Sequence, residues 1–416
     1  MADNEIEVAI VGAGAAGIGA ARRLRDAGIS VLLIEARPRL GGRAFTVDGG
    51  SGMPIDLGCG WLHSADRNPW SEIAKAQGRT IDRTPPPWAR ATTPTGSPSP
   101  DQASFHEAIL DFREQVAAFP QDGPDRAASS LLEPGARWNR LLDAVSTYYS
   151  GAELDRISIR DLMRYGDTGV NWRVVEGYGT VVAAHAAGVP ARLGCAVRAI
   201  DHAGQRVELQ TDEGTIRAER AIVTVPSDLI AREAIRFNPA LPEKVEAAAG
   251  LPLGLADKLF LSLAGGEAFE ADSRLWGRMD RVDTGAYHIR PFGRPQIEAY
   301  FGGDLAAELE KGGEAAFFDF AAGELAETFG KDFASRIGPI GMHPWKADPY
   351  ARGSYSYALP GRADCRAKLA EPVDDRLFFA GEACSRNDFS TAHGAYLTGL
   401  DAAERIIALH RPKPRK

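Results

Sequence analysis

The order of hydrophobic and polar positions predicts a strand, a helix and a second strand at the start of the chain. Residues 6–11 form a short β-branched run, residues 15–27 are rich in Ala, Arg and Leu, and residues 30–34 are again apolar. Short apolar runs bounded by turn residues are typical of buried strands, whereas Ala, Leu and Arg favour helix. Gly28 is expected to end the helix. This part of the chain therefore predicts a βαβ unit.

The middle of the chain alternates between loop, helix and strand patterns. Residues 84–104 are rich in Pro, Ser and Thr and predict a long surface loop without regular structure. Residues 105–149 have a helical pattern. Polar and apolar positions then alternate around an Asp-Glu-Gly turn, which predicts a hairpin that leads into a buried strand over residues 221–225.

The second half of the chain predicts more strands and two helices. The stretches "DKLFLSLA" and "PQIEAYFGG" read as strands, and a helical pattern over residues 314–328 follows them. Residues 377–409 predict a strand, a glycine turn, a loop and a helix. A strand and glycine turn that lead to a helix therefore occur near both ends of the chain.

Three glycines, Gly12, Gly14 and Gly17, form a G-x-G-x-x-G turn between the first strand and the first helix. Such a turn lets a pyrophosphate approach the amides at the helix N-terminus. Glu35 ends the second strand, where an acid can bind ribose hydroxyls. Strand, turn, helix, strand and acid follow one another in the order of a dinucleotide site. The alternative is a glycine-rich helix start that binds no ligand.

The tripeptide Gly41-Gly42-Arg43 helps to choose between FAD and NAD. A glycine turn followed by a guanidinium can lie along the pyrophosphate of an extended dinucleotide. Taken alone, the tripeptide is more often a surface turn. Its place directly after the dinucleotide pattern favours FAD.

Length and composition limit the other possibilities. A chain of 416 residues favours two domains, and a net charge of -8 argues against a nucleic-acid partner. The four cysteines form no CxxC pair, which is typical of reduced thiols in a cytosolic protein. The polar start "MADNE" predicts no signal peptide, the basic tail "HRPKPRK" is expected to be a frayed end, and no apolar stretch has the length of a membrane span. We therefore expect a cytoplasmic enzyme.

Several further stretches stand beside the dinucleotide pattern. They are "DLGCGWLH", "VEGYGTVV", "IVTVP", "LGLADKLFLSL", "DPYARGSYS" and "LFFAGEACSRNDFSTAHGAYLTG". With their order and spacing, the chain resembles the flavin-containing amine oxidases, which include monoamine and polyamine oxidases, over nearly its whole length. The resemblance implies an α/β fold with a Rossmann-like FAD-binding domain of the GR2 type and an interleaved α+β substrate-binding domain.

The domains are expected to be discontinuous. The FAD-binding domain would comprise residues 1–75, 190–250 and 345–416. The substrate-binding domain would comprise the two intervening pieces, residues 76–189 and 251–344. The active site would then lie between the domains, beside the flavin.

The resemblance also implies which residues contact FAD. Gly381 and Glu382 would lie along the ribityl and pyrophosphate, and the helix that starts near Ala392 would direct its N-terminus at the negative charge of a reduced flavin ring. Val197 matches a position whose backbone contacts adenine. The expected FAD contacts are Gly12, Gly14, Ala15, Ala16, Gly17, Glu35, Ala36, Arg37, Gly42, Arg43, Gly58, Cys59, Gly60, Trp61, Val197, Trp345, Gly381, Glu382, Thr391 and Ala392.

Lys258 and Tyr355 are the candidate catalytic residues. Lys258 interrupts an apolar strand, and a buried lysine is costly without a task. In the resembling family this lysine holds a water near flavin N5, whereas the strand alone also permits an outward-facing side chain. Tyr355 matches one ring of a two-ring cage around the amine, since the face of an aromatic ring attracts an amine. The alternative for Tyr355 is a packing residue of its strand.

The remaining candidate residues concern the substrate and the attachment of the flavin. The second ring of the cage falls at Thr391, which is not aromatic, so the cage is expected to be incomplete. Phe389 could replace it if the loop were displaced. His63 and Trp61 are expected to border the substrate cavity. Ser354 stands where some relatives carry a cysteine bound to flavin, and a serine predicts non-covalent FAD.

The resulting hypothesis is an FAD-dependent amine oxidase. It would transfer a hydride from the carbon beside nitrogen to flavin N5 and use oxygen to form hydrogen peroxide and an imine or aldehyde. The alternatives are a desaturase of the protoporphyrinogen or carotenoid type, an L-amino-acid oxidase, and a flavoprotein without catalysis. The sequence leaves open the identity of the amine, the preference for primary or secondary amines, the oligomeric state and the physiological electron acceptor.

Overall fold

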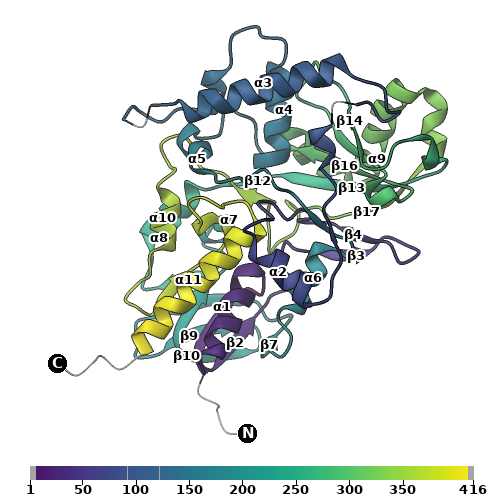
Figure 1. Ribbon diagram of the computed structural model, residues 1–416. Helices are drawn as coiled ribbons and strands as arrows, with labels where there is room; N and C mark the ends of the chain where they lie inside the picture. The colour runs from purple at the N-terminus through teal and green to yellow at the C-terminus, as the bar shows by residue number, and fades with distance from the viewer. Residues whose placement is uncertain (1–5, 91, 121, 411–416) are drawn as a thin grey trace.

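Two β-sheets organise the protein, seen in a computed structural model that describes residues 6–90, 92–120 and 122–410 (Figure 1). The larger sheet has eight strands, of which β19 (Leu377–Phe379) pairs with β10 beside the main path. In spatial order the other strands are β11 (Arg236–Asn238), β8 (Val197–Asp201), β9 (Val207–Thr211), β10 (Gly214–Val223), β1 (Ile6–Val11), β2 (Val31–Ile34) and β7 (Ala191–Arg192).

The centre of this sheet is parallel and buried on both faces. β1 runs parallel to β2 and β10, and β10 runs parallel to β19. Val8 and Ile10 share a core with the first and last helices, whereas Ala9 and Val11 belong to the core on the opposite face. Parallel sheets covered on both faces read as continuous apolar runs, which explains the pattern of β1. The two helices are α1 (Ala15–Asp26) and α11 (Ala392–His410).

The helices α1 and α11 lie side by side on one face of the large sheet (Figure 1). Two glycines permit this contact. A Cβ atom added to Gly19 of α1 would lie 2.7 Å from the ring of Tyr396, and one added to Gly399 of α11 would lie 2.1 Å from the carbonyl oxygen of Ala16. The two helix backbones therefore pack directly against each other.

The smaller sheet is antiparallel and has five strands. Their spatial order is β14 (Ser273–Trp276), β15 (Ala286–Ile289), β16 (Gln296–Gly302), β13 (Ala256–Leu263) and β17 (Ile337–Met342). Leu259, Ala299 and Tyr287 face one way and share a core with α9 (Gly303–Phe329). Since successive side chains alternate between faces, the neighbouring residues face the other way.

That second face carries polar and charged side chains in two adjacent rows. The strand register aligns Lys258, Tyr300, Ala286 and Trp276 in one row, and Phe260, Glu298, His288 and Arg274 in the next. An antiparallel sheet with one apolar and one polar face commonly turns the polar face to water. Here Lys258, Glu298 and His288 are all buried, so the polar face belongs to an interior site.

Shorter elements connect and cover the two sheets. α3 (Pro100–Ala117), α4 (Asn139–Ser150) and α5 (Ile159–Arg164) lie on the side of the small sheet in Figure 1. The other helices and strands are β3 (Thr46–Asp48), β4 (Pro54–Asp56), α2 (Pro69–Ala76), β5 (Ile81–Asp82), β6 (Arg173–Val174), α6 (Tyr178–Ala184), α7 (Ser227–Ala231), α8 (Pro242–Ala249), β12 (Leu253–Gly254), β18 (Tyr355–Ser356) and α10 (Cys365–Ala370). The described chain also has the short 3-10 turns η1 (Pro87–Ala89), η2 (Ala128–Leu131), η3 (Gly266–Ala268), η4 (Pro291–Gly293), η5 (Lys331–Arg336) and η6 (Glu382–Cys384).

The structure confirms most of the predicted elements. The βαβ unit, the hairpin, the strands β13 and β16 and the terminal strand-loop-helix segment are all present. The helix predicted over residues 314–328 is part of α9, which starts earlier and is kinked at Gly313, where φ is +64°. A glycine with positive φ interrupts the regular helix there.

Two predictions about the middle of the chain are wrong. A single helical pattern over residues 105–149 is divided into α3 and α4, because the intervening segment contains Pro124 and Pro134, which interrupt helices. The irregular loop predicted over residues 84–104 ends early. Ser99 caps α3, because a serine followed by proline suits a helix start.

Two predicted features lie outside the described residues, namely the acidic start at residues 1–5 and the end of the basic tail at residues 411–416. Within the described ranges, no helix has both the length and the apolar character needed to cross a membrane. A cytoplasmic location stays a prediction.

Candidate active site

A cavity of about 440 Å³ is lined by residues of both sheets. Val11 and Gly12 reach it from the end of β1, whereas Lys258 and Tyr300 reach it from the polar face of the small sheet. The cavity therefore joins the expected dinucleotide turn to the candidate catalytic lysine.

The predicted site residues converge on this cavity, with one exception. Gly17 is not among the lining residues, and a Cβ atom there would lie 2.0 Å from the carbonyl oxygen of Gly12. The third glycine therefore allows α1 to pack against the turn. The residues that do line the cavity are Gly12, Gly14, Ala15, Ala16, Glu35, Ala36, Arg37, Gly42, Arg43, Gly58, Cys59, Gly60, Trp61, His63, Val197, Lys258, Trp345, Tyr355, Gly381, Glu382, Thr391 and Ala392.

The first glycine turn has the backbone shape that its sequence predicts. Gly12 has a φ of +102°, and its amide donates to the carbonyl of Ile34 at 2.8 Å. Gly41 of the second glycine pair donates to the carbonyl of Ala13 at 2.8 Å, so the two turns contact each other. A Cβ atom on Gly14 would make an ordinary contact with Gly42, 3.9 Å away, so the second glycine pair packs closely beside this turn.

Glu35 follows the end of β2 and is buried. Its carboxylate accepts from the amide of Ala13 at 2.8 Å and from that of Arg37 at 2.9 Å. The Arg37 guanidinium is held in turn by Asp348, at 2.7 Å. Burial opposes ionisation of Asp348, but His343 and Arg37 outweigh it and lower the pKa of this carboxyl. The acid at the expected ribose position is therefore fixed by backbone amides.

The C-terminal glycine turn reaches the same cavity through Gly381 and Glu382. Gly381 has a φ of +142°, which disfavours other residues, and a Cβ atom there would meet no atom within 4 Å. Glu382 is buried and pairs with Arg43 of the Gly-Gly-Arg turn at 3.0 Å. Burial opposes ionisation of Glu382, but Arg43 and Ser356 outweigh it and lower its pKa. The ion pair connects two turns that lie far apart in the sequence.

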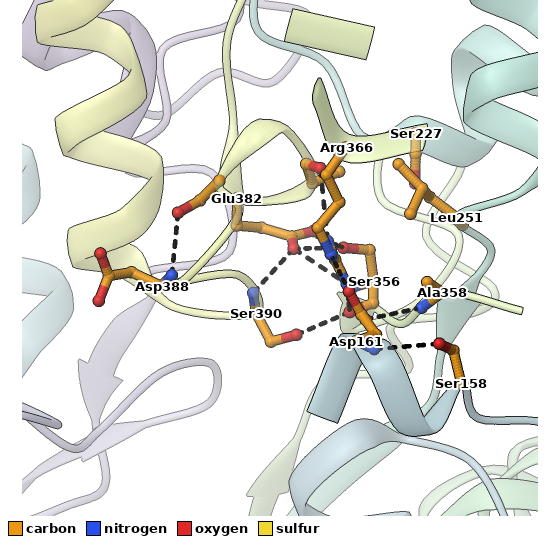
Figure 2. Close-up of polar contacts among 12 residues, drawn as sticks. Ser158, Asp161, Ser227, Leu251, Ser356, Ala358, Arg366, Glu382, Asp388 and Ser390 are labelled. Carbon is orange, nitrogen blue, oxygen red and sulfur yellow. Dashed lines mark hydrogen bonds and ion pairs between the residues drawn. The ribbon is translucent and has the colours of Figure 1, made fainter. Parts of the chain in front are cut away.

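A buried polar network fixes Glu382 from behind (Figure 2). The Glu382 carboxylate accepts from the hydroxyl of Ser356 at 2.6 Å and from the amide of Ser390 at 3.0 Å. Arg366 donates to Ser356 at 2.9 Å and forms two bonds of 2.7 Å with Asp161. Paired bonds between a guanidinium and a carboxylate define both distance and orientation. The network therefore links α5, α10 and β18 to the turn before α11.

Thr391 caps the helix that follows. Its hydroxyl accepts from the amide of Gly394 at 2.9 Å and donates to the carbonyl of Asp388 at 2.6 Å. The start of α11 lines the cavity at Ala392 and Ala395. The first amides and the positive dipole end of this helix therefore border the cavity.

Lys258 is buried on the polar face of the small sheet, and sequence reasoning missed its partners. Its ammonium pairs with Glu298 at 2.9 Å, and Glu298 lies 3.5 Å from His288. Burial opposes ionisation of Glu298, but Lys258 and His288 outweigh it and lower its pKa. A charge inside an apolar strand identifies Lys258. The same signal is present in the stretch "QIEAYFG", which contains Glu298.

The ion network continues away from Lys258. His288 contacts Asp272 at 2.9 Å, and Asp272 pairs with Arg173 at 2.8 Å. Arg173 pairs further with Asp82 at 2.5 Å. Buried charges are tolerated when they are paired in this manner. The network therefore anchors the lysine through residues from β5, β6, β15 and the segment before β14.

His63 presents a defined hydrogen-bonding state to the cavity. Its Nδ1 lies 2.6 Å from the side-chain oxygen of Asn171, whose amide nitrogen donates to the carbonyl of Gly169 at 3.0 Å. That arrangement makes Nδ1 the donor and leaves Nε2 as an acceptor. Burial lowers the pKa of His63, which favours the neutral imidazole. The ring can therefore accept a hydrogen bond at Nε2.

Aromatic rings form part of the cavity wall. Tyr355 donates from its hydroxyl to the backbone carbonyl of Tyr148, which holds the ring, and burial raises its pKa. Tyr148 and Tyr300 also line the cavity and were missed by sequence reasoning. Phe389 is not a lining residue, and its ring packs on Tyr165 at 5.1 Å. The tyrosine rings beside Tyr355 in the cavity wall are those of Tyr148 from α4 and Tyr300 from β16.

Two stretches noted in the sequence meet behind the cavity. Asp56 accepts from the amides of Tyr178 and Gly179 at 2.9 and 3.2 Å, so the stretch "DLGCGWLH" caps the helix α6 in "VEGYGTVV". Cys59 follows Asp56, and burial raises the pKa of its thiol to about 12. This thiol therefore stays protonated near neutral pH.

Two tryptophans complete the wall between the glycine turns and the small sheet. Trp345 is buried and donates from its indole to the carbonyl of Leu57 at 3.0 Å. Trp61 stacks on His288, with ring centres 6.2 Å apart, and packs edge-on against Trp88 at 4.5 Å. Both tryptophans thus have a packing role as well as a place on the cavity surface.

The fold and the site define a dinucleotide-dependent α/β enzyme. Two helix N-termini, three glycine turns and the buried acid Glu35 surround one end of the cavity. The backbone amides there can donate to a pyrophosphate, and the carboxylate can accept from ribose hydroxyls. Open space at Gly381 fits a ligand that lies against the backbone. In the part of the chain that the structure describes, no cluster of His, Cys, Asp or Glu could hold a metal ion.

Comparison with known proteins defines the family. A model of flavin-containing amine oxidoreductases matches residues 101–407, and a model of NAD(P)-binding Rossmann-like domains matches residues 10–76. The chain belongs to the flavin-containing amine oxidoreductases. It is an FAD-dependent amine oxidase that acts on CH–NH or CH–NH2 donors with oxygen as acceptor. The desaturase and L-amino-acid oxidase alternatives are not favoured.

Individual relatives agree with this assignment. Polyamine oxidase 3 of Oryza sativa subsp. japonica is 30% identical, with 97% of this chain and 90% of that protein covered. Polyamine oxidase 2 of Arabidopsis thaliana is 29% identical, over 99% of this chain and 90% of that protein. A solved structure of a putrescine oxidase variant has a TM-score of 0.75 at 19% identity and covers 97% of this chain and 99% of that one, which confirms the fold.

Proposed function

We propose that the enzyme oxidises an elongated aliphatic amine whose reacting C–N bond lies between His63, Lys258 and the aromatic rings of the cavity. The observation that carries this proposal is the cavity that these residues share with the glycine turns. Curated relatives named polyamine oxidases support an aliphatic amine.

The roles of the dinucleotide residues form part of the proposal. Gly12, Gly14 and the start of α1 would hold the pyrophosphate, and Glu35 the ribose. Gly381, Glu382 and the start of α11 would face the ribityl chain and the flavin ring. The remaining contacts would come from the lining residues Ala15, Ala16, Ala36, Arg37, Gly42, Arg43, Gly58, Cys59, Gly60, Trp61, Val197, Trp345, Thr391 and Ala392.

The domain division follows the same reasoning. The large sheet takes its strands from residues 6–34, 191–238 and 377–379, whereas the small sheet takes its strands from residues 256–342. This supports an FAD-binding domain assembled from three separated stretches, as expected from the sequence. The substrate-binding domain would consist of the two intervening stretches.

When bound, FAD accepts a hydride equivalent from the carbon beside nitrogen and passes two electrons to oxygen, which with two protons gives hydrogen peroxide. His63 would accept a hydrogen bond from the N–H of the amine at Nε2 and orient the reacting nitrogen. Tyr355 and Tyr300 would present ring surfaces to the substrate. Lys258, held by Glu298, would keep a positive charge beside the flavin during the reaction with oxygen.

FAD is proposed to be non-covalent. Ser354 cannot form a thioether, and its hydroxyl is already used, because it accepts from the amide of Ala256 at 2.9 Å and donates to its carbonyl at 2.8 Å. Acid precipitation is expected to leave the flavin in the supernatant. Yellow colour in the washed protein pellet would contradict non-covalent binding.

The proposed function is tested by an anaerobic visible spectrum of the purified holoenzyme. Monoalkylamines, diaminoalkanes, polyamines, aryl-alkyl amines, ω-amino acids and α-amino acids are added in turn. Bleaching of the flavin band by aliphatic amines, followed by peroxide formation on admission of air, supports the proposal. If dithionite bleaches the flavin band but none of the aliphatic amines does, the proposal is wrong.

A further inference from the structure

Arg274 is a cation that the site described so far does not use. It belongs to β14 and shares a row of the polar face with His288 and Glu298, so it lies on the same side of the small sheet as Lys258. Its guanidinium carbon lies 3.3 Å from the ring centre of Trp276. Three strand spacings, roughly 14 Å, separate β14 from the strand of Lys258.

No described residue gives Arg274 a hydrogen bond or an ion pair. The carboxylates on the same face are already used, because Asp272 pairs with Arg173 at 2.8 Å. Glu298 pairs with Lys258 at 2.9 Å. A guanidinium away from bulk water is normally paired. The N–H donors of Arg274 are therefore available to a ligand.

Arg274 is not itself a lining residue of the cavity, but two of its neighbours are. Tyr148, Tyr149 and Tyr300 are its electrostatic neighbours, and Tyr148 and Tyr300 line the cavity. The ring of Trp276, on which the guanidinium lies, stacks on that of Tyr148 with centres 6.1 Å apart. Burial lowers the pKa of Arg274 to about 10, although the side chain keeps some contact with solvent. A partly desolvated cation forms strong hydrogen bonds to an anion that comes within reach.

The substrate side of the cavity offers no lining carboxylate to a second cation among the described residues. Among the described residues that line the cavity, the carboxylates are Glu35 and Glu382, and both belong to the dinucleotide end. A diamine extended along the sheet from Lys258 would bring its second ammonium toward Arg274. Like charges in a desolvated site repel each other.

We propose that Arg274 binds a carboxylate at the far end of the amine substrate, so that the enzyme prefers amino acids in which a long chain separates the amine from the carboxylate. This inference rests on the proposed function and adds that the second end of the substrate is anionic. It differs from α-amino-acid oxidation, because the carboxylate lies far from the carbon that reacts.

The first experiment uses the wild-type holoenzyme and anaerobic rapid-mixing measurements of flavin reduction. Linear ω-amino acids of increasing length are compared with their terminal amides, and with diaminoalkanes and monoalkylamines of the same length. The best ω-amino acid is expected to have an apparent Kd about 10- to 100-fold below that of its amide. An amide or diamine that binds as tightly as the ω-amino acid would overturn the inference.

The second experiment substitutes the arginine. Arg274→Gln is expected to raise the apparent Kd of the ω-amino acid by about 10- to 100-fold and to change that of the monoalkylamine less than about twofold. Arg274→Lys is expected to recover part of the affinity. Arg278→Gln serves as the matched control, since Arg278 pairs on the surface with Asp280 at 3.0 Å and Glu327 at 3.1 Å.

The outcomes separate this inference from the proposed function. If monoalkylamines or diamines reduce the flavin and ω-amino acids do not, the proposed function stands and the carboxylate site is wrong. If no aliphatic amine of the series reduces the flavin, both are wrong. An equal loss of affinity for the ω-amino acid and the monoalkylamine in Arg274→Gln would assign Arg274 a structural role and overturn the inference.

Discussion

The two ends of the cavity are built by different means. At the dinucleotide end, glycines bring backbone amides and two helix N-termini to the surface, and few side chains are needed. At the proposed substrate end, the polar face of the small sheet holds a chain of paired charges that starts at Lys258. The first end depends on close approach of backbones, whereas the second depends on the completeness of an ion network. The two ends should therefore respond to substitution in different ways.

The largest expected effect is at the dinucleotide end. Gly17→Ala would place a Cβ atom 2.0 Å from the carbonyl oxygen of Gly12, so α1 must move away from the turn. We expect the Kd for FAD to rise at least about 100-fold, which equilibrium dialysis or flavin fluorescence measures.

Gly323→Ala is the matched control for this substitution. Gly323 lies in α9, and a Cβ atom there would meet no atom within 4 Å. This variant is expected to bind FAD normally and to unfold at the same or slightly higher temperature, because alanine favours helix. Normal FAD affinity in Gly17→Ala would show that the turn tolerates displacement.

The next effect is at the substrate end. Glu298→Gln leaves Lys258 buried without its carboxylate partner and is expected to reduce the free energy of unfolding by about 3–5 kcal/mol. Urea unfolding of the holoenzyme measures this change. The double variant Lys258→Met with Glu298→Gln is expected to lose less than the sum of the two single losses, because both charges are then removed.

The control for the ion network is an exposed carboxylate. Glu327 pairs with Arg278 at the surface, so Glu327→Gln is expected to change the free energy of unfolding by less than about 1 kcal/mol. If the losses in the free energy of unfolding of the Lys258 and Glu298 single variants add up to that of the double variant, the two residues do not stabilise each other.

The ion network at the substrate end predicts that the stability of the protein depends on pH. The pKa values of Glu298 and Asp272 are lowered in the folded protein, because their cationic partners outweigh the effect of burial. Their contribution to stability is complete above the ordinary carboxyl pKa of about 4 and is lost as the pH falls below it. Glu298→Gln should therefore flatten the acid side of the stability profile, measured as urea midpoints from neutral pH downward. An unchanged acid slope would contradict the role of this pair.

The smallest expected effect concerns Cys59. Burial raises the pKa of this thiol to about 12, so it stays protonated near neutral pH although it lies in the cavity wall. Cys59→Ser is expected to leave the rate of anaerobic flavin reduction within about twofold of wild type, because a protonated thiol is a poor nucleophile. A loss of more than tenfold would show that the sulfur takes part in catalysis or positions the cofactor.

The difference between the two ends of the cavity also explains which parts of the site could be predicted from the sequence. Backbone turns impose glycine at fixed spacings, so Gly12, Gly14 and the Gly-Gly-Arg turn are recognisable from the order of residues alone. The ion network depends on strand register, which pairs Glu298 with His288 across β16 and β15. Register is set by long-range packing that a single sequence does not show. Lys258 stands out as a charge in an apolar strand, but its partners, and Arg274 on the same sheet face, become apparent only when the strands are paired.

The direct packing of α1 on α11 has a consequence for how the protein is made. α1 begins at Ala15 and its partner α11 begins at Ala392, so nearly all of the described chain is synthesised between them. Domains of many proteins fold while the chain is still leaving the ribosome. The nucleotide-binding part that is synthesised first lacks the helix that completes it, so capture of FAD is expected to be a late event that follows release of the chain. Binding of FAD by ribosome-held chains that stop before residue 392 would contradict this order.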